Sequence, residues 1–411
     1  MGGRLTPEPL QQLVRAEWWR AVATVTRLTG DLELAEEAVQ DACVVALQQW
    51  PRDGVPANAS SWLIGTARHN ALDRMRRESG RARKEQLAAL EARRAPVHHG
   101  DPGGFGDDQL ALIFTCCHPA LDPAVRVPLT LRAVCGLSTA EIAAVHLMPE
   151  PTMAQRLVRA KHKIRDAGIA LRVPRRDERA ERTADVLRVV YLTYTEGHRA
   201  ARSPGLVRGD LCEEAIRLAR GLVALMPGEP EVAGLLALLL LTDARRAART
   251  DEAGRIVLLD DQDRGRWDAA KIVEGSALVE AALRQGHPGP YQLQAAIAAC
   301  HAAAVSVDAT DWPQIAALYD ALLALEPSGV VAANRAVAVG MAHGPAAGLA
   351  LADELAERPE LRRWAPLHMA RADLLRRLGR TGEAAEAYLE AARLDPPPAE
   401  HELIMRRLAA L

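Results

Sequence analysis

Apolar residues recur along most of this chain at the three- and four-residue spacing of an amphipathic helix, and stretches that alternate apolar and polar residues are hard to find. A first helix is predicted over Leu10–Leu28, ended by Gly30. Asp31 is the expected N-cap of a second helix, which is predicted to stop at Pro51, and a third helix follows over about 60–77. The pattern predicts an all-α fold.

Two short helices with a tight break between them are predicted over Gly136–Arg165. Ser138 and Glu141 have the spacing of a capping box, in which each side chain accepts a hydrogen bond from the other residue's backbone N–H. A helix is therefore expected to begin at Ser138. The Met148–Pro151 stretch is expected to end this helix before a second helix begins near Thr152.

The second of these helices has one apolar face and one polar face. Its apolar positions recur at spacings of four, three and four residues: Met153, Leu157, Ala160 and Ile164. The remaining surface carries Gln155, Arg156, Arg159, Lys161, His162, Lys163 and Arg165. Arg and Gln offer donors suited to guanine and adenine edges, whereas Lys acts mainly as a point charge toward phosphates. A lone basic helix is more often a solvated surface helix, but the capped helix and short turn before it favour a DNA-binding helix-turn-helix.

A second basic surface is predicted on the third helix, ahead of the helix-turn-helix. Its apolar stripe consists of Ile64, Ala67, Ala71 and Met75. Its polar side carries Arg68, His69, Asn70, Arg74, Arg76 and Arg77. The formal net charge of the chain is only −2, which argues against a protein that coats nucleic acid nonspecifically. DNA contacts are therefore expected at these local basic patches.

Composition and motifs argue against a signal peptide, a membrane span, a zinc site and an enzyme. Aromatic residues make up 3% of the 411 residues, there is no apolar signal core at the N-terminus, and the longest apolar run, Leu235–Leu241, is too short to span a bilayer. The six cysteines include no C-x-x-C pair, which fits a reduced cytoplasmic setting, and the adjacent Cys116 and Cys117 cannot easily bind one zinc ion. Without a P-loop, H-E-x-x-H or G-x-S-x-G motif, we expect no enzymatic activity, metal or cofactor.

Composition shifts divide the chain into three helical parts. Residues 8–79 hold the first three helices, and a linker that is first charged and then Gly-rich follows over 80–107. Residues 108–171 form a compact unit with the helix-turn-helix, and 172–182 form a second linker. The remaining helical domain is expected over 183–411.

This last domain contains a weak internal repeat. Tyr388 and Pro396 stand eight residues apart, as do Tyr319 and Pro327, and the two tyrosines are 69 residues apart, close to two 34-residue tetratricopeptide (TPR) periods. The final copy has small residues, an aromatic residue and a helix-ending proline at the TPR positions: Gly379, Ala384, Tyr388, Ala391 and Pro396. A TPR-like α-solenoid is favoured over a nonrepetitive helical bundle, and its concave surface would serve as a scaffold or bind a partner.

The N-terminal part of the chain resembles an extracytoplasmic-function (ECF) sigma factor, the sigma-70 class that carries only regions 2 and 4. Residues 35–50 look like region 2.2, residues 61–77 like regions 2.3 and 2.4, and residues 136–165 like region 4.2. The resemblance implies binding to the β′ clamp helices of core RNA polymerase through Gln40 and Asp41, and promoter-specific initiation of transcription. An ordinary exposed helix face is the plainer interpretation of these two residues.

The resemblance also implies how promoter DNA is read. The Arg52–Ala59 loop and residues 68–70 would capture an unpaired base of the minus-10 element, and the helix-turn-helix would read the minus-35 element through Gln155, Arg156 and Arg159. Three positions depart from the family pattern. They are His69, where many relatives have Asn, Ala154, where they often have a cation, and Leu147, where the turn usually has glycine. The promoter sequence therefore stays open.

The C-terminal extension resembles that of ECF group 42, whose members carry a TPR-type domain. The resemblance rests on Tyr191–Ala200, Gly289–Ala302 and the TPR-like end. It implies regulation through the extension, with a small DGGR-motif protein as a candidate partner. For Tyr191, Tyr194, Glu196 and His198, a regulatory contact and simple helix packing are both open.

Two other functions fit part of the pattern. One is a TPR scaffold whose N-terminal helices bind protein, and the other is a conventional helix-turn-helix transcription regulator with a TPR-type sensor domain. Neither needs a second basic helix ahead of the helix-turn-helix, so residues 61–77 favour the sigma factor.

Overall fold

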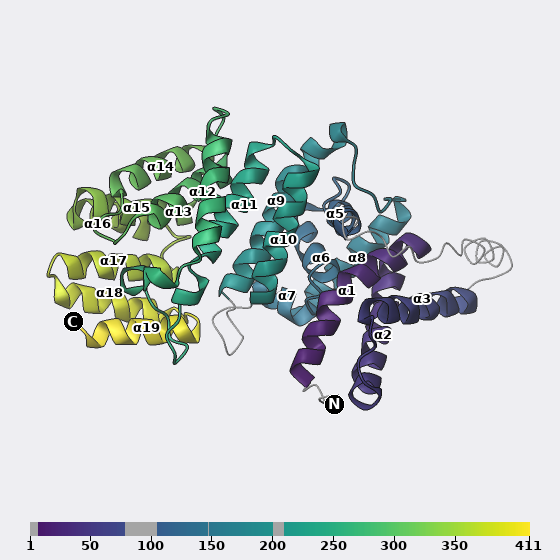
Figure 1. The fold of residues 1–411 in the computed structure, drawn as a ribbon. Coiled ribbons are helices and arrows are strands. Elements are labelled where there is room, and N and C mark those ends of the chain that lie inside the picture. The colour runs from purple at the N-terminus through teal and green to yellow at the C-terminus, as the bar shows by residue number, and fades with distance from the viewer. Residues whose placement is uncertain (1–6, 79–104, 147, 200–208) are drawn as a thin grey trace. The chain divides into compact units, whose positions relative to one another are not determined.

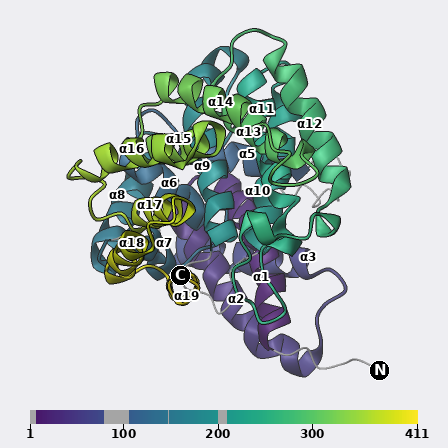
Figure 2. The same ribbon diagram turned by 90° about the vertical axis from the view of Figure 1, so that its left-hand side faces the viewer.

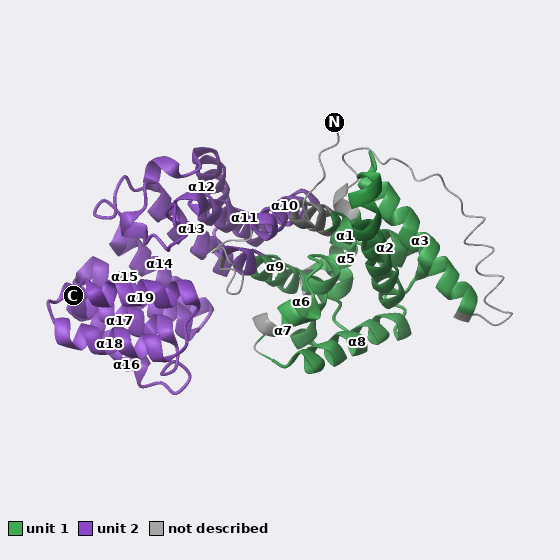
Figure 3. Ribbon diagram, turned by 90° about the horizontal axis from the view of Figure 1, so that it is seen from below, with its two compact units in different colours: residues 1–193 green, residues 194–411 purple. Residues whose placement is uncertain are grey.

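The computed structural model describes residues 7–78, 105–146, 148–199 and 209–411. The chain divides into two compact units, residues 1–193 (unit 1) and residues 194–411 (unit 2) (Figure 3). Among the described residues every regular element is a helix, and a single isolated β-bridge joins Thr250 to Ile256. The expected all-α fold is confirmed.

Unit 1 begins with a three-helix arrangement made of α1 (Pro7–Thr29), α2 (Leu32–Asp53) and α3 (Ala59–Glu78). Each of these helices packs against the other two, and each contributes fully buried side chains, such as Val22, Val39 and Leu63. Burial of these apolar stripes is the main force that holds the three helices together.

The two ends of α2 show how local sequence sets its limits. The Asp31 carboxylate accepts hydrogen bonds from the backbone N–H groups of Glu33 and Leu34, so the predicted N-cap is confirmed. The predicted stop at Pro51 is wrong, because α2 continues to Asp53. A proline removes one backbone donor, and so close to the end of a helix that loss is tolerated until Gly54 terminates it with a positive φ of 85°.

The second half of unit 1 contains α5 (Phe105–Cys116), α6 (Pro123–Ala133), α7 (Thr139–Val145) and α8 (Glu150–Asp166), and α9 (Arg176–Arg199) crosses from unit 1 into unit 2. Most of the expected 80–107 linker lies outside the described residues, and its last residues already belong to α5. The second expected linker, 172–182, runs into the first turns of α9.

Unit 2 continues as a chain of helices that pack mainly on their neighbours in sequence. They are α10 (Gly209–Leu225), α11 (Pro230–Asp243), α12 (Ala269–Leu283), α13 (Pro290–Ala303), α14 (Trp312–Leu325), α15 (Gly329–His343), α16 (Pro345–Ala356), α17 (Ala365–Arg377), α18 (Thr381–Arg393) and α19 (Pro398–Ala409). The pairs α15–α16 and α17–α18 lie side by side in two perpendicular views (Figures 1 and 2). Such nearest-neighbour packing is typical of stacked helix pairs.

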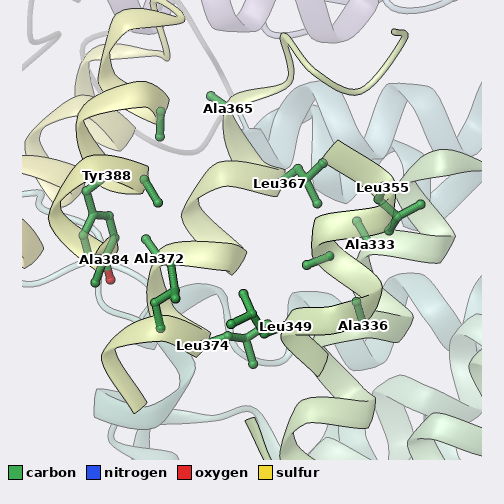
Figure 4. Close-up of a cluster of buried hydrophobic side chains, with 14 of the residues drawn as sticks. Ala333, Ala336, Leu349, Leu355, Ala365, Leu367, Ala372, Leu374, Ala384 and Tyr388 are labelled. Carbon is green, nitrogen blue, oxygen red and sulfur yellow. The ribbon is translucent and has the colours of Figure 1, made fainter. Parts of the chain in front are cut away.

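Helices α15–α19 share one hydrophobic core (Figure 4). Leu349 of α16, Leu374 of α17 and Tyr388 of α18 are among its buried members. Helices α15 and α16 approach so closely that a Cβ atom on Gly348 would lie 2.6 Å from the Cα atom of Gly340. Only glycine fits at position 348 without moving one of the two helices.

The segment 244–268 joins α11 to α12 and contains three short 3-10 turns, at Arg246–Ala248, Leu259–Asp261 and Arg264–Arg266. It reaches distant helices of the same unit (Figure 1). The Arg377 guanidinium of α17 lies 3.2 Å from the Asp260 carboxylate, and the Arg406 guanidinium of α19 donates to the Ile256 carbonyl at 2.8 Å. Connections this long inside a compact domain are uncommon and are often functional.

None of the helices in the described part of the chain combines the length and the apolar character that a bilayer crossing requires. The leucine-rich run of α11 is instead a core element, because every residue from Leu235 to Leu241 is buried.

Candidate nucleic-acid interface

The helix-turn-helix begins with a glycine turn and a capping box. Gly136 has a positive φ of 65°, and a Cβ atom there would lie 3.2 Å from the Trp18 ring of α1. The Ser138 backbone N–H donates to the Glu141 carboxylate at 2.7 Å, and the Glu141 N–H donates to the Ser138 hydroxyl at 3.2 Å. The predicted capping box is therefore confirmed, and Ser138 caps α7 from just outside the helix.

The recognition helix α8 begins earlier than predicted. Pro149 is its N-cap and Glu150 its first residue, so the expected start near Thr152 is two residues late. Pro151 lies inside the first turn, where a missing N–H has no helical partner to lose. Leu147, the position of the unusual turn residue, lies outside the described residues.

The apolar face of α8 is as predicted, and its polar face is as predicted in part. Met153, Leu157, Ala160 and Ile164 are all buried. On the opposite side Gln155, Arg156, Arg159 and Lys163 are exposed, and none of them forms a hydrogen bond or ion pair with a described residue. Burial lowers the pKa of nearby His146, and the positive charge of Arg156 lowers it further. This face can meet phosphates and base edges without first breaking an internal contact.

The C-terminal half of α8 is instead paired with α2. Lys161 Nζ lies 3.1 Å from a carboxylate oxygen of Glu36, whose side chain is only 3% exposed. The Arg132 guanidinium of α6 lies 3.5 Å from the same oxygen. Two further pairs line this contact: His162 with Glu33 at 3.1 Å and Arg165 with Asp31 at 3.5 Å. Lys161 was predicted to face DNA, and in this structure it faces a buried carboxylate.

On α3 most of the predicted polar side chains also have internal partners. Arg74 pairs with Glu37 and, at 2.7 Å, with Asp41. Arg76 and His69 both lie against Asp73, at 3.2 and 3.3 Å. The Asn70 amide lies 3.5 Å from the Ala38 carbonyl oxygen. Arg68 and Arg77 form no ion pair within the described ranges.

The two α2 residues predicted to contact polymerase are exposed. Asp41 belongs to the Arg74 ion pair, and the Gln40 side chain accepts a hydrogen bond of 3.4 Å from Arg132. The face of α2 that carries them is therefore accessible, but its polar groups are shared with α3 and α6.

Both parts of unit 1 match known families. Residues 13–81 match Sigma-70 region 2, and residues 111–164 match Sigma-70, region 4. The chain is 30% identical over 143 residues to the ECF RNA polymerase sigma factor SigC of Mycobacterium tuberculosis, a match that covers 35% of this chain and 72% of that protein. The chain belongs to the ECF sigma factors. A probable RNA polymerase sigma-C factor of Mycobacterium bovis matches to the same extent.

The C-terminal part of this sigma factor has relatives whose function is not described by their names. Residues 182–283 match a family of unknown function (DUF6596). An uncharacterized protein of Rhizobium meliloti is 44% identical over 393 residues, which is 95% of this chain and 92% of that protein. No solved structure matches the chain.

The loop between α2 and α3 of this sigma factor is bordered by two tryptophans. The rings of Trp50 and Trp62 meet edge to face with centroids 5.4 Å apart. Asn58 caps α3, since its side-chain oxygen accepts from the Ser61 N–H at 2.9 Å. The residues between Gly54 and Asn58, of which Ala57 is exposed and Val55 and Pro56 are half-buried, are thus held at both ends, a feature not predicted from the sequence.

Five of the six cysteines of this sigma factor are buried, and Cys300 is partly exposed. Burial raises the pKa of the Cys116 thiol well above its usual value and that of Cys117 to about 12, so both are protonated at neutral pH. A metal would need thiolates. The described part of the chain has no group of three or more side chains placed to hold a metal ion.

Proposed function

We propose that this sigma factor is a promoter-specificity subunit that binds core RNA polymerase and reads two promoter elements through α3 and α8. One observation carries the proposal: a single compact unit presents two separate polar helix faces, and each belongs to a segment that matches a sigma-70 region. A repressor with one helix-turn-helix needs only one such face. No covalent chemistry is required, and a cytoplasmic location follows from this role.

Helix α8 is the proposed reader of the minus-35 element. Gln155, Arg156 and Arg159 have the donors to recognise base edges, and their freedom from internal partners supports this role. Lys163 is assigned to backbone phosphates. Lys161 can reach DNA only if its contact with Glu36 breaks, so its part in binding depends on a movement of α8 relative to α2.

Helix α3 is the proposed reader of the minus-10 element, through Arg68, His69, Asn70, Arg74, Arg76 and Arg77. The loop before it would take the unpaired base, and the Trp50–Trp62 pair provides aromatic surface next to that loop. Gln40 and Asp41 on α2 are the proposed contacts to the β′ clamp helices. Because Asp41 pairs with Arg74, a polymerase contact at Asp41 would release Arg74 for the minus-10 strand.

Unit 2 is the proposed regulatory part, with TPR-like helix pairs as in ECF group 42. Support comes from α17 and α18: Gly379 turns the chain between them with a positive φ of 73°, and Ala384, Tyr388 and Ala391 are buried. Burial of Tyr194 favours packing as the role of the Tyr191–Ala200 motif. A small DGGR-motif protein remains a predicted partner that rests on the resemblance.

The decisive experiment is reconstituted transcription with core polymerase and a library of genomic promoter fragments. We expect the full-length chain to direct initiation at a defined subset of fragments. Gln40→Ala should weaken polymerase binding, whereas Gln48→Ala, at another exposed glutamine of the same helix, should not. Correctly folded protein that initiates at no fragment would exclude the sigma role.

A truncated chain would test regulation by unit 2. The end point should follow Arg199, because α9 belongs in part to unit 1: Arg126 pairs with Asp185, and the Cys135 thiol lies 3.6 Å from the Thr193 hydroxyl. A cut within 172–182 would remove these contacts. Higher activity of the truncated chain would show that unit 2 inhibits, lower activity that it activates, and equal activity would contradict a regulatory role.

A further inference from the structure

A cluster of arginines without carboxylate partners lies where the segment 244–268 meets α13. Arg245 and Arg264 both pack on the ring of Trp267, with their guanidinium carbons 5.8 and 4.5 Å from its centre. His301, from the motif near the end of α13, belongs to the same cluster, because Arg264 donates to its backbone carbonyl at 2.8 Å. Like charges gathered on one ring need a compensating group.

Arg264 is only partly satisfied. Its Nη1 group donates to the carbonyl oxygens of His301 and Ala304, at 2.8 and 2.6 Å, and so caps the C-terminal end of α13. Its Nη2 group is buried and has no partner. The indole N–H of Trp267 and Nδ1 of His301 are also buried without partners. Three polar groups in one cluster therefore lack a hydrogen bond to any residue that the structure describes.

Arg245 has no hydrogen-bond or ion-pair partner among the described residues, and it is partly exposed. The next residue shows the usual arrangement: Arg246 lies 3.1 Å from Glu213 and 3.4 Å from Asp243. A covered cation without a counter-ion is costly, and proteins normally pair such groups.

The electrostatics of the cluster agree with this geometry. Burial lowers the pKa of the Arg245 guanidinium, the positive charge of Arg249 lowers it further, Tyr194 opposes that change, and Arg264 adds to it. Burial and the same two guanidiniums, Arg245 and Arg264, lower the pKa of His301 to about 4. The imidazole is therefore neutral at pH 7 and does not add a repelling charge. What the site lacks is a negative charge.

We propose that the Arg245–Arg264 cluster is a binding site for a small molecule with an oxyanion group, a carboxylate or a phosphate. The partly exposed guanidinium of Arg245 is planar and can donate two parallel hydrogen bonds to such a group. The partly covered position of this guanidinium admits a small anion more readily than the surface of another protein. Since Arg249 donates to the His198 carbonyl at 2.9 Å, the site also adjoins the C-terminal end of α9.

Isothermal titration calorimetry on the full-length chain tests the site directly, with no need for transcription. Sodium phosphate and sodium acetate serve as separate probes, each against sodium chloride of equal ionic strength. We expect saturable binding of at least one of the two probes, and the tighter one identifies the class of oxyanion. Arg245→Gln should raise the Kd about tenfold or more, which is the usual effect of losing a charged hydrogen bond.

Arg284→Gln is the matched control, because Arg284 is an exposed arginine that caps the C-terminal end of α12, and it lies 3.9 Å from the Glu280 carboxylate. It should leave the Kd unchanged. Circular dichroism checks that each variant is folded. Arg245→Lys keeps the positive charge but loses the planar pair of N–H donors, so it should raise the Kd several-fold. The proposal would be overturned if neither probe binds saturably. It would also be overturned if the Kd is unchanged in Arg245→Gln or in Arg245→Lys.

Discussion

Lys161 of unit 1 and Arg245 of unit 2 are both cations largely covered by protein, but their surroundings differ in one respect. Lys161, with a side chain 12% exposed, has the buried Glu36 carboxylate at 3.1 Å. Arg245 has two further arginines near it and no carboxylate. A covered cation with a carboxylate of its own is part of the packing and must leave it to act elsewhere. A covered cation without one is suited to an external anion.

The exposed cations of α8 form a third case. Arg156 and Arg159 also lack partners in the described part of the chain, but they are exposed to water, so they remain unpaired at little cost. The lesson is that the meaning of an unpaired arginine depends on its burial. The following predictions test this ordering, from the largest expected effect to the smallest.

Glu36→Ala should give the largest effect. It leaves Lys161 and Arg132, with side chains 12% and 18% exposed, without their shared carboxylate, and the free energy of unfolding of unit 1 should fall by about 3–5 kcal/mol. Urea denaturation measures this. Glu37→Ala is the control, because its pair with Arg74 is exposed and should be worth less than about 1 kcal/mol. Equal losses for the two variants would contradict the distinction.

The arginine cluster should make stability depend on pH through His301. Its pKa is about 4 in the folded chain against 6.5 when unperturbed, so the unfolded chain binds the proton more tightly. The contribution of His301 is fully present above pH 6.5 and is lost as pH falls toward 4, by about 3 kcal/mol at 1.36 kcal/mol per pH unit. His301→Gln should flatten the stability curve between those values. A curve that keeps its slope in this variant would assign the effect to other groups.

Arg159→Ala should weaken promoter binding by about 1–3 kcal/mol and relax the preference at one base position, if the exposed face of α8 reads bases. Competition assays with promoter variants would measure both effects. Lys163→Ala is expected to weaken binding to all DNA sequences alike. It should also lower by about one the slope of the logarithm of the binding constant against the logarithm of the salt concentration. The same profile for Arg159→Ala would reduce its role to a phosphate contact.

Arg74→Ala should have the smallest effect on stability. Its side chain is 35% exposed and those of Glu37 and Asp41 are 53% and 51% exposed, so water and salt screen both pairs. We expect a change below about 1 kcal/mol that disappears in high salt. Recognition of the minus-10 element should suffer more than folding. A large, salt-independent loss would place Arg74 with Lys161 instead.

Local sequence patterns predicted the fold well. The Asp31 N-cap, the Ser138–Glu141 capping box and the buried face of α8 depend on residues within one or two turns, and all are found in the structure. The errors lie at helix ends. Pro51 and Pro151 were interpreted as breaks, although proline is tolerated in the last and first turns of a helix.

The site could be predicted only in part. The exposure of Gln155, Arg156 and Arg159 follows from helical periodicity, but the pairing of Lys161 with Glu36 joins residues 125 positions apart. Only the packing of α2 against α8 brings them together. The Arg245 cluster is equally non-local, because its members come from a long connection and from the end of α13. An excess of arginine in 244–268 was the one signal available in the sequence.

The contacts of the segment 244–268 bear on how unit 2 unfolds. A linear stack of helix pairs can lose its terminal pairs one after another, since each pair depends only on its neighbour. Here Arg377 and Arg406, from α17 and α19, contact Asp260 and Ile256, which lie far back in the sequence. Fraying of the C-terminal helices would therefore release this segment as well. Unit 2 should lose its structure as one cooperative block, so that loosening at its C-terminal end is felt at the arginine cluster.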